Sequence, residues 1–131
     1  MKRLSILVKS LFASSLLLTL FGGEAAAQHH TRIASWIEKE TKTSNLVFTA
    51  WFKNDSSQTI KNLSYQFNGW KKSQAGTSQT SQSGKFKAIA GKTKSLATIK
   101  WNNAEDAEIT LKLDIFHKNE LIATDSLNLK P

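Results

Sequence analysis

Six lysines in the middle of the chain are the side chains whose type and spacing best suit a binding site. They are Lys71, Lys72, Lys85, Lys87, Lys92 and Lys94. Ammonium groups attract acidic groups through a field that salt weakens, so this pattern predicts an acidic partner rather than bond-making chemistry. For any single lysine, a solvated surface role is the simpler interpretation, and only the cluster supports the prediction.

Three further side chains lie among these lysines and complete the predicted partner-binding set. Trp70 adjoins Lys71, where an exposed indole would anchor an interface, although a place in the core suits it equally well. Phe86 is the single large apolar residue between Lys71 and Lys87, and Gln82 lies in the same segment. We therefore predict a basic edge formed by Trp70, Gln82, Phe86 and the six lysines.

The acidic and histidine side chains form no recognisable catalytic motif. Most acids between Glu38 and Asp125 are expected on solvent-facing strand positions or in turns. No histidine occurs in an acid/base or nucleophile pattern, and His117 is interpreted as a turn residue beside Lys118. The sequence predicts a protein that is not an enzyme and has no cofactor.

Residues 1–27 have the organisation of a secretory signal peptide. Met1-Lys-Arg opens the chain, an apolar run extends from Leu11 to Gly23, and Ala25-x-Ala27 provides a small-residue cleavage site. The alternative is a retained membrane anchor, but this run is shorter than the roughly 20 residues that a bilayer requires. We predict cleavage before Gln28, no stable membrane insertion, and a mature protein in the periplasm or outside the cell.

One candidate metal ligand lies at the start of the exported chain. Cleavage after Ala27 would make His30 the third residue, and an amine, amides and an imidazole can bind copper or nickel in a square plane. Gln28 can cyclise and remove the amine, and a short unstructured start is the simpler interpretation. We therefore predict no metal site and keep His30 as the candidate to test.

Composition limits the mature chain to one small basic domain without thiol chemistry. Residues 28–131 suffice for one core, and loss of the leader lowers the formal charge from +8 to about +6. This positive charge favours acidic partners, and export argues against intracellular nucleic acid. Because the chain contains no cysteine, disulfides and thiolate metal sites are excluded and the core alone must stabilise the fold. We expect a monomer.

Apolar residues recur with a period of two, which predicts strands separated by polar turns. The pattern is clear in residues 44–53, 63–67 and 95–101. It is clearest in the hairpin at 108–129, where Leu121 to Leu129 continue the apolar face after the turn at 117–120. A first strand is expected within the N-terminal segment 28–43, where the alternation is poor.

About seven such strands and a single proline predict an all-β, immunoglobulin-like sandwich of two sheets over residues 44–131. A small barrel is the competing architecture. Trp36, Trp51 and Trp101 are expected to fill the core. The segment from Lys71 to Lys87 is too polar for a buried strand, so it is either a flexible hairpin loop or an exposed sheet edge. An edge would let an extended partner chain add a strand.

The segment from Tyr65 to Phe86 resembles the CsgC/CsgH-like family of curli assembly chaperones. The matching residues are Tyr65-Gln-Phe67, Gly76-x-Ser78 and Gln82-Ser-Gly-Lys-Phe86, and Gly91 and the strand at 96–101 fit the layout. The resemblance implies a small periplasmic immunoglobulin-like sandwich that keeps secreted amyloid subunits unpolymerised until they are exported. The CsgC branch carries a Cys-x-Cys pair. Because this chain has no cysteine, a redox role is out of reach and the CsgH branch is favoured.

Charge and resemblance together predict a non-enzymatic periplasmic chaperone or inhibitor that acts on acidic, curli-type amyloid subunits. Such a domain would bind a strand weakly and cover its edge, which slows in-register strand addition. The alternative is a secreted adhesion or carbohydrate-binding module that places exposed aromatics and lysines on an anionic glycan. A third option, a minor fibre component, predicts that the purified protein itself forms fibres.

Overall fold

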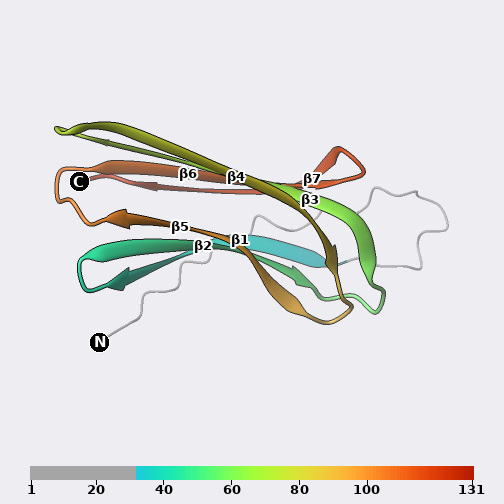
Figure 1. Cartoon of the computed structure of the whole chain (residues 1–131). Helices are drawn as coiled ribbons and strands as arrows, with labels where there is room; N and C mark the ends of the chain where they lie inside the picture. The colour runs from blue at the N-terminus through green and yellow to red at the C-terminus, as the bar shows by residue number, and fades with distance from the viewer. Residues whose placement is uncertain (1–31) are drawn as a thin grey trace.

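The computed structural model describes residues 32–131, which form seven antiparallel strands in two packed layers (Figure 1). The strands are β1 (Ile33–Lys42), β2 (Asn45–Asn54), β3 (Ile60–Ser73), β4 (Gly76–Ala88), β5 (Thr93–Asn102), β6 (Glu108–His117) and β7 (Glu120–Leu129). No helix in this part of the chain is long and apolar enough to cross a bilayer. The predicted signal peptide and His30 lie outside the described residues.

The two layers confirm the prediction of an immunoglobulin-like sandwich and not a closed barrel. One sheet has the order β1-β2-β5 and the other the order β4-β3-β6-β7. In a constant-type immunoglobulin domain the fourth strand pairs with the fifth. Here β4 pairs with β3 instead, from Ser73 opposite Gly76 to Ile60 opposite Ala88. This exchange makes β4 the edge of the four-stranded sheet.

The core consists of the inward-facing residues of both sheets, with β2 and β6 as the main contributors. Every second residue of each strand is buried, as the sequence alternation predicts. The buried hydrophobic residues of these two strands are Leu46, Phe48, Ala50, Phe52, Ile109, Leu111, Leu113 and Ile115. Burial of each large side chain stabilises the fold by about 1.5–3 kcal/mol relative to exposure, so this layer sets the orientation of every strand.

Only one of the three tryptophans predicted for the core packs there. Trp101 contacts the ring of Phe48 edge-on, with ring centroids 6.4 Å apart. Trp36 and Trp51 lie opposite one another on β1 and β2, and their rings stack on the outer face with a 6.4 Å centroid separation. The prediction was wrong for both because Ile37 and the neighbours of Trp51 occupy the inward positions.

A buried carboxylate closes the side of the sandwich where β1 meets β7. Asp125 is 8% exposed, and its Oδ2 accepts a 3.0 Å hydrogen bond from the main-chain N–H of Ile37. Most acids are exposed or half-buried as expected, but Asp125 is an exception because strand alternation turns it inward with Ala123 and Leu127. One buried carboxyl group therefore satisfies a main-chain donor of the facing sheet.

A β-bulge corrects the pattern predicted for the start of β7. The register shifts between Ile115 and Phe116, so that Phe116 lies opposite Leu121 rather than Ile122. Leu121, which the sequence assigned to the apolar face of the hairpin, is 53% exposed as a result. A bulge inserts one extra residue, so the side chains beyond it point to the opposite face of the sheet. No residue type in this hairpin predicts the bulge.

The tight packing around Gly69 gives a first prediction. A Cβ added to Gly69 would lie 2.9 Å from both Leu111 Cδ2 and Trp101 Cη2. Overpacking of this kind costs about 1–3 kcal/mol, so Gly69→Ala should lower the free energy of unfolding in urea by that amount. Ser81→Ala, on the exposed face of the adjacent β4, should change it by less than about 0.5 kcal/mol. Equal stability of the two variants would contradict this packing.

The buried carboxylate gives a second prediction. Asp125→Ala should lower the free energy of unfolding by about 2 kcal/mol, because it leaves the Ile37 N–H without this buried acceptor. Amide hydrogen exchange should show faster exchange at Ile37, while the matched removal of an exposed acid in Glu120→Ala should leave both quantities near those of the unsubstituted protein. Unchanged exchange at Ile37 would show that this bond does not hold β1 against β7.

Candidate functional site

The predicted partner-binding segment is an edge strand and not a loop. β4 spans 13 residues, pairs with β3 on one side, and has no strand of its sheet on the other. Its side chains alternate between exposed positions on the outer face and half-buried positions toward the sandwich, ending at buried Ala88. The outer positions are Thr77, Gln79, Ser81, Ser83, Lys85 and Lys87. Of the two structures considered for this segment, the exposed edge is present.

The inner face of β4 explains why so polar a segment forms a strand. The ring of Phe86 packs edge-on against Phe52, with centroids 5.3 Å apart, and lies 6.3 Å from Tyr65. Gly84 leaves room for the Tyr65 ring, since an added Cβ there would lie 3.0 Å from Tyr65 Cε1. Aromatic packing at one end of β4 therefore fixes the register of its polar remainder.

Gln82 ties β4 to the opposite sheet. Its Nε2 donates a 2.9 Å hydrogen bond to the main-chain oxygen of Thr98 on β5. β4 and β5 are the edge strands on this side of the sandwich, and this exposed amide links them. The side chains of Gln82 and Phe86, both in the predicted partner-binding set, are thus engaged within the domain. The main-chain atoms of these two residues remain along the β4 edge.

The six lysines do not form one cluster. Lys72 lies opposite Thr77 near the start of β4, whereas Lys85 comes eight residues later, which corresponds to about 27 Å along a strand. Lys92 and Lys94 follow the end of β4 and accompany Lys85 and Lys87. Because exposed charges are screened within about 8 Å at physiological salt, the pair Lys71 and Lys72 acts separately from the other four.

Trp70 and Lys71 occupy the far end of the edge from these four lysines. Trp70 is half-buried, and its position next to buried Gly69 places its side chain on the outer face, between Gln79 and Thr110 in register. Lys71 Nζ donates a 3.1 Å hydrogen bond to the main-chain oxygen of Asn102. Of the two positions weighed for Trp70, the surface is the one found.

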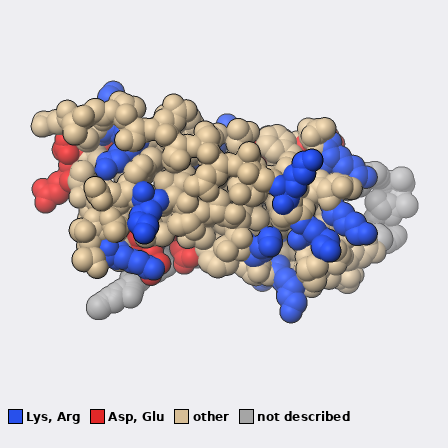
Figure 2. Space-filling model, in the orientation of Figure 1, with Lys and Arg blue, Asp and Glu red and all other residues tan. Residues whose placement is uncertain are grey.

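The positive charge of the domain is concentrated at one end. We define the basic end as the end where β2, β4 and β6 finish. It carries eight basic residues: Arg32, Lys53, Lys61, Lys85, Lys87, Lys92, Lys94 and Lys118. Only Asp55 and Glu120 are acidic there. In Figure 2, Lys and Arg side chains lie at both ends but are denser at the right, and most of the visible acidic side chains lie toward the left.

The excess of basic over acidic residues at the basic end equals the excess in residues 32–131 as a whole. Residues 32–131 contain 15 basic and 9 acidic residues, so the remainder of the domain is neutral. None of the ion pairs found within these residues involves a lysine of the basic end; they join Lys42 to Glu40, Lys112 to Asp114 and Lys130 to Glu108. The lysines of the basic end are therefore available to an external anion.

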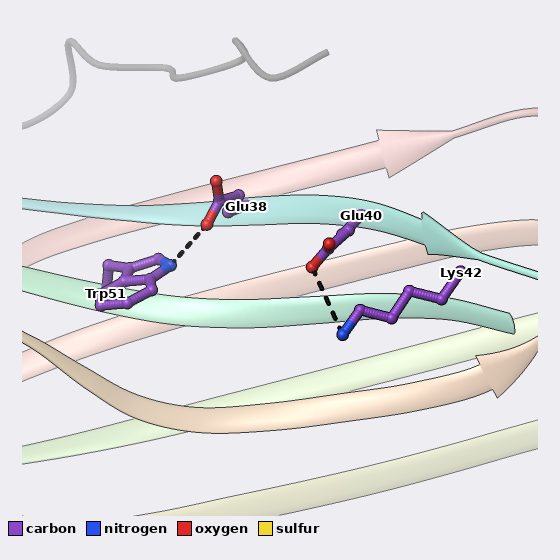
Figure 3. Close-up of polar contacts among 4 residues, drawn as sticks. All are labelled: Glu38, Glu40, Lys42 and Trp51. Atoms are coloured by element: carbon purple, nitrogen blue, oxygen red, sulfur yellow. Dashed lines mark hydrogen bonds and ion pairs between the residues drawn. The ribbon is translucent and has the colours of Figure 1, made fainter. Parts of the chain in front are cut away.

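A second surface, absent from the predicted set, lies on the outer face of β1 and β2. Figure 3 shows Glu38 directed at the Trp51 indole, whose Nε1 donates a 2.8 Å hydrogen bond to Glu38 Oε1. Farther along β1, Lys42 Nζ lies 3.9 Å from Glu40 Oε1. The Trp36–Trp51 stack is thus held in a fixed orientation. The sequence signal for this surface was that each tryptophan lies beside a core residue. Because side chains alternate along a strand, the tryptophan must then point outward.

Residues 32–131 contain no group of three or more His, Cys, Asp or Glu side chains that could hold a metal ion. No protein-family model and no curated protein matches the sequence.

Two solved structures share the architecture of this chain. The R. palustris CsgH solution structure has a TM-score of 0.58 at 18% identity, over 73% of this chain and 91% of that one. The E. coli curli protein CsgC has a TM-score of 0.57 at 15% identity, over 78% of this chain and all of that one. At these identities the likeness is one of fold. The sandwich described above is therefore a CsgC/CsgH-like fold without cysteine, as the resemblance in residues 65–86 predicted.

Proposed function

We propose that the protein is a periplasmic, non-enzymatic chaperone that prevents premature polymerisation of acidic, curli-type amyloid subunits during secretion. The observation that carries this proposal is β4, a long edge strand without a neighbour in its sheet and with lysines near both ends. The similarity of the fold to CsgH and to the curli protein CsgC supports a curli-related role.

The edge of β4 offers main-chain hydrogen bonds with little side-chain grip. An extended subunit segment can add to such an edge as a further strand. The outer positions from Thr77 to Ser83 carry only short hydroxyl side chains and one glutamine, which do not form the interdigitated apolar contacts of a fibre. Binding is therefore weak and reversible, and it occupies the strand that the next subunit would use.

The two lysine groups serve both attraction and protection. Lys85 and Lys87 lie on the exposed face of β4 near its end, and the exposed Lys72 lies on β3 opposite Thr77, near the start of β4. Lysines on an edge oppose pairing between two copies of the same domain, because like charges would meet. The same charges raise the encounter rate with an acidic chain at low salt.

Fibre growth of a curli-type major subunit, followed by dye fluorescence, tests this function. We expect a long lag at a low ratio of this protein to subunit, and a shorter lag at high salt. Lys72, Lys85 and Lys87 changed together to Ser should shorten the lag strongly. The same change of charge at Lys39, Lys42 and Lys100, on the three-stranded sheet, should preserve it. An unchanged lag at equimolar protein would refute the function for that subunit.

Amide NMR signals separate edge docking from attraction by charge alone. A subunit peptide should shift or broaden the amides of Thr77 to Lys87 on β4. The amides of β7 serve as the internal control, because β7 is the other edge of the same sheet and lies against β1. If the peptide perturbed only lysine side-chain signals and not the β4 amides, electrostatic attraction alone would explain the longer lag. Docking of the peptide on the β4 edge would then be refuted.

The Trp36–Trp51 stack favours a second candidate, a glycan-binding module. A planar aromatic pair held by Glu38 can pack against the apolar face of a sugar ring. Under the first function, Trp36→Ala should leave the lag of fibre growth unchanged, and titration with anionic glycans should give no saturable change in tryptophan fluorescence. The glycan module would be supported instead if the protein had no effect on the lag and bound a glycan saturably. That binding should be lost in Trp36→Ala and retained in Trp70→Ala.

A further inference from the structure

The basic end combines charge with exposed apolar surface. The strand registers place Lys85, Ser64, Phe116 and Leu121 in one row across the outer face of β4, β3, β6 and β7. Phe116 is half-buried there and Leu121 is 53% exposed. On the opposite flank, Ile89 follows β4 and is 45% exposed. Leu121 and Ile89 are the exposed large hydrophobics of residues 32–131, and both lie at this end.

A cationic groove opens at this end, between the start of β3, the end of β4 and the turn after β6. It has a volume of about 550 Å³, and its polar lining consists of Asn62, Ser64, Lys85, Lys87, Lys118 and Asn119. No acidic residue lines it. The main-chain N–H of Lys118 donates a 3.1 Å hydrogen bond to the oxygen of Asn62, which fixes the turn against the start of β3. Lysine and amide donors around one groove suit an oxyanion such as a phosphate.

The distribution of the charge indicates the shape of the partner. Lys53, Lys92 and Lys94 come from the three-stranded side, whereas Lys61, Lys85, Lys87 and Lys118 come from the four-stranded side. A single extended strand would meet one flank of this end. A planar anionic surface meets the turns of both sheets together, and it also accepts the exposed aliphatic side chains of Leu121 and Ile89.

The entry of the chain is at the same end. The main-chain N–H of Asp55 donates a 2.8 Å hydrogen bond to the oxygen of Arg32, the first described residue. In the sequence, the apolar run predicted to engage the export membrane ends at Gly23, nine residues before Arg32. Nine residues reach at most about 30 Å when fully extended. Before cleavage of the predicted leader, the basic end is therefore held close to a bilayer.

We propose that the basic end is a peripheral docking surface for anionic phospholipid. The groove takes a lipid phosphate, the surrounding lysines neutralise neighbouring headgroups, and Leu121 and Ile89 enter between them. The domain then lies end-on at the membrane, with the β4 edge free along its side. This surface shares Lys85 and Lys87 with the proposed chaperone surface, but it requires neither an amyloid subunit nor an accessible β4 edge, so vesicle binding tests it separately.

Co-sedimentation with vesicles tests the proposal. The probe is phosphatidylcholine vesicles with and without phosphatidylglycerol, mixed with protein purified from the periplasm and checked by mass spectrometry for its N-terminus. We expect binding to the anionic vesicles alone, weakened by salt. Lys85, Lys87 and Lys118 changed together to Gln should weaken it about a hundredfold, because each lysine near an anionic surface contributes about fivefold. Leu121→Ser should weaken it several-fold.

The matched control removes the same charge elsewhere. Lys39, Lys72 and Lys100, all exposed and all outside the basic end, changed together to Gln, should retain most of the binding. Equal losses in the two triple variants would overturn the proposal, because net charge and not the basic end would then be responsible. The proposal would also be overturned if the protein did not bind anionic vesicles. If it instead bound a polyglutamate peptide, and the Lys85, Lys87 and Lys118 variant lost that binding, the partner would be an acidic protein.

Discussion

Apolar packing between the two sheets determines which side chains of this domain can meet a partner. Phe48, Phe52, Leu111 and Leu113 are fully buried, and strand alternation carries that constraint outward to every neighbour. Lys85 and Lys87 are exposed because Phe86 between them packs on Phe52. The surface that a partner could meet is thus a consequence of core packing, because the inward residue beside each outward position fixes its orientation.

The sides of the sandwich are closed by polar contacts of unequal strength. Where β1 meets β7, the buried carboxyl group of Asp125 accepts a hydrogen bond from a main-chain donor, and a bond shielded from water is electrostatically stronger. Where β4 meets β5, the exposed Gln82 amide reaches a main-chain oxygen in contact with water. A bond that competes with water contributes less. The β4 side is therefore the more adaptable of the two, which suits the edge proposed to receive another chain.

Much of the architecture follows from the sequence, because a period of two is visible wherever one face of a strand is buried. β2 and, apart from Leu121, the β6–β7 hairpin were predicted in position and orientation, and the polar segment containing β4 was recognised as unfit for the core. What failed depended on contacts across strands. Trp36 and Trp51 were assigned by size rather than by their place beside inward residues, and the bulge that exposes Leu121 leaves no local trace. The lysines looked like one cluster because positions 71 to 94 are close in sequence. The long strand β4 separates Lys72 from Lys85 in space.

The concentration of charge at the basic end makes the domain a permanent electric dipole whose positive pole coincides with the entry of the chain. Such a body experiences a torque in any external field, so an approaching polyanion or anionic surface rotates it before contact. Rotation reduces the fraction of collisions that arrive in an unproductive orientation, and it does so for a thread-like polymer as well as for a plane. Orientation, more than strength of attraction, is what an uneven distribution of fifteen basic side chains provides.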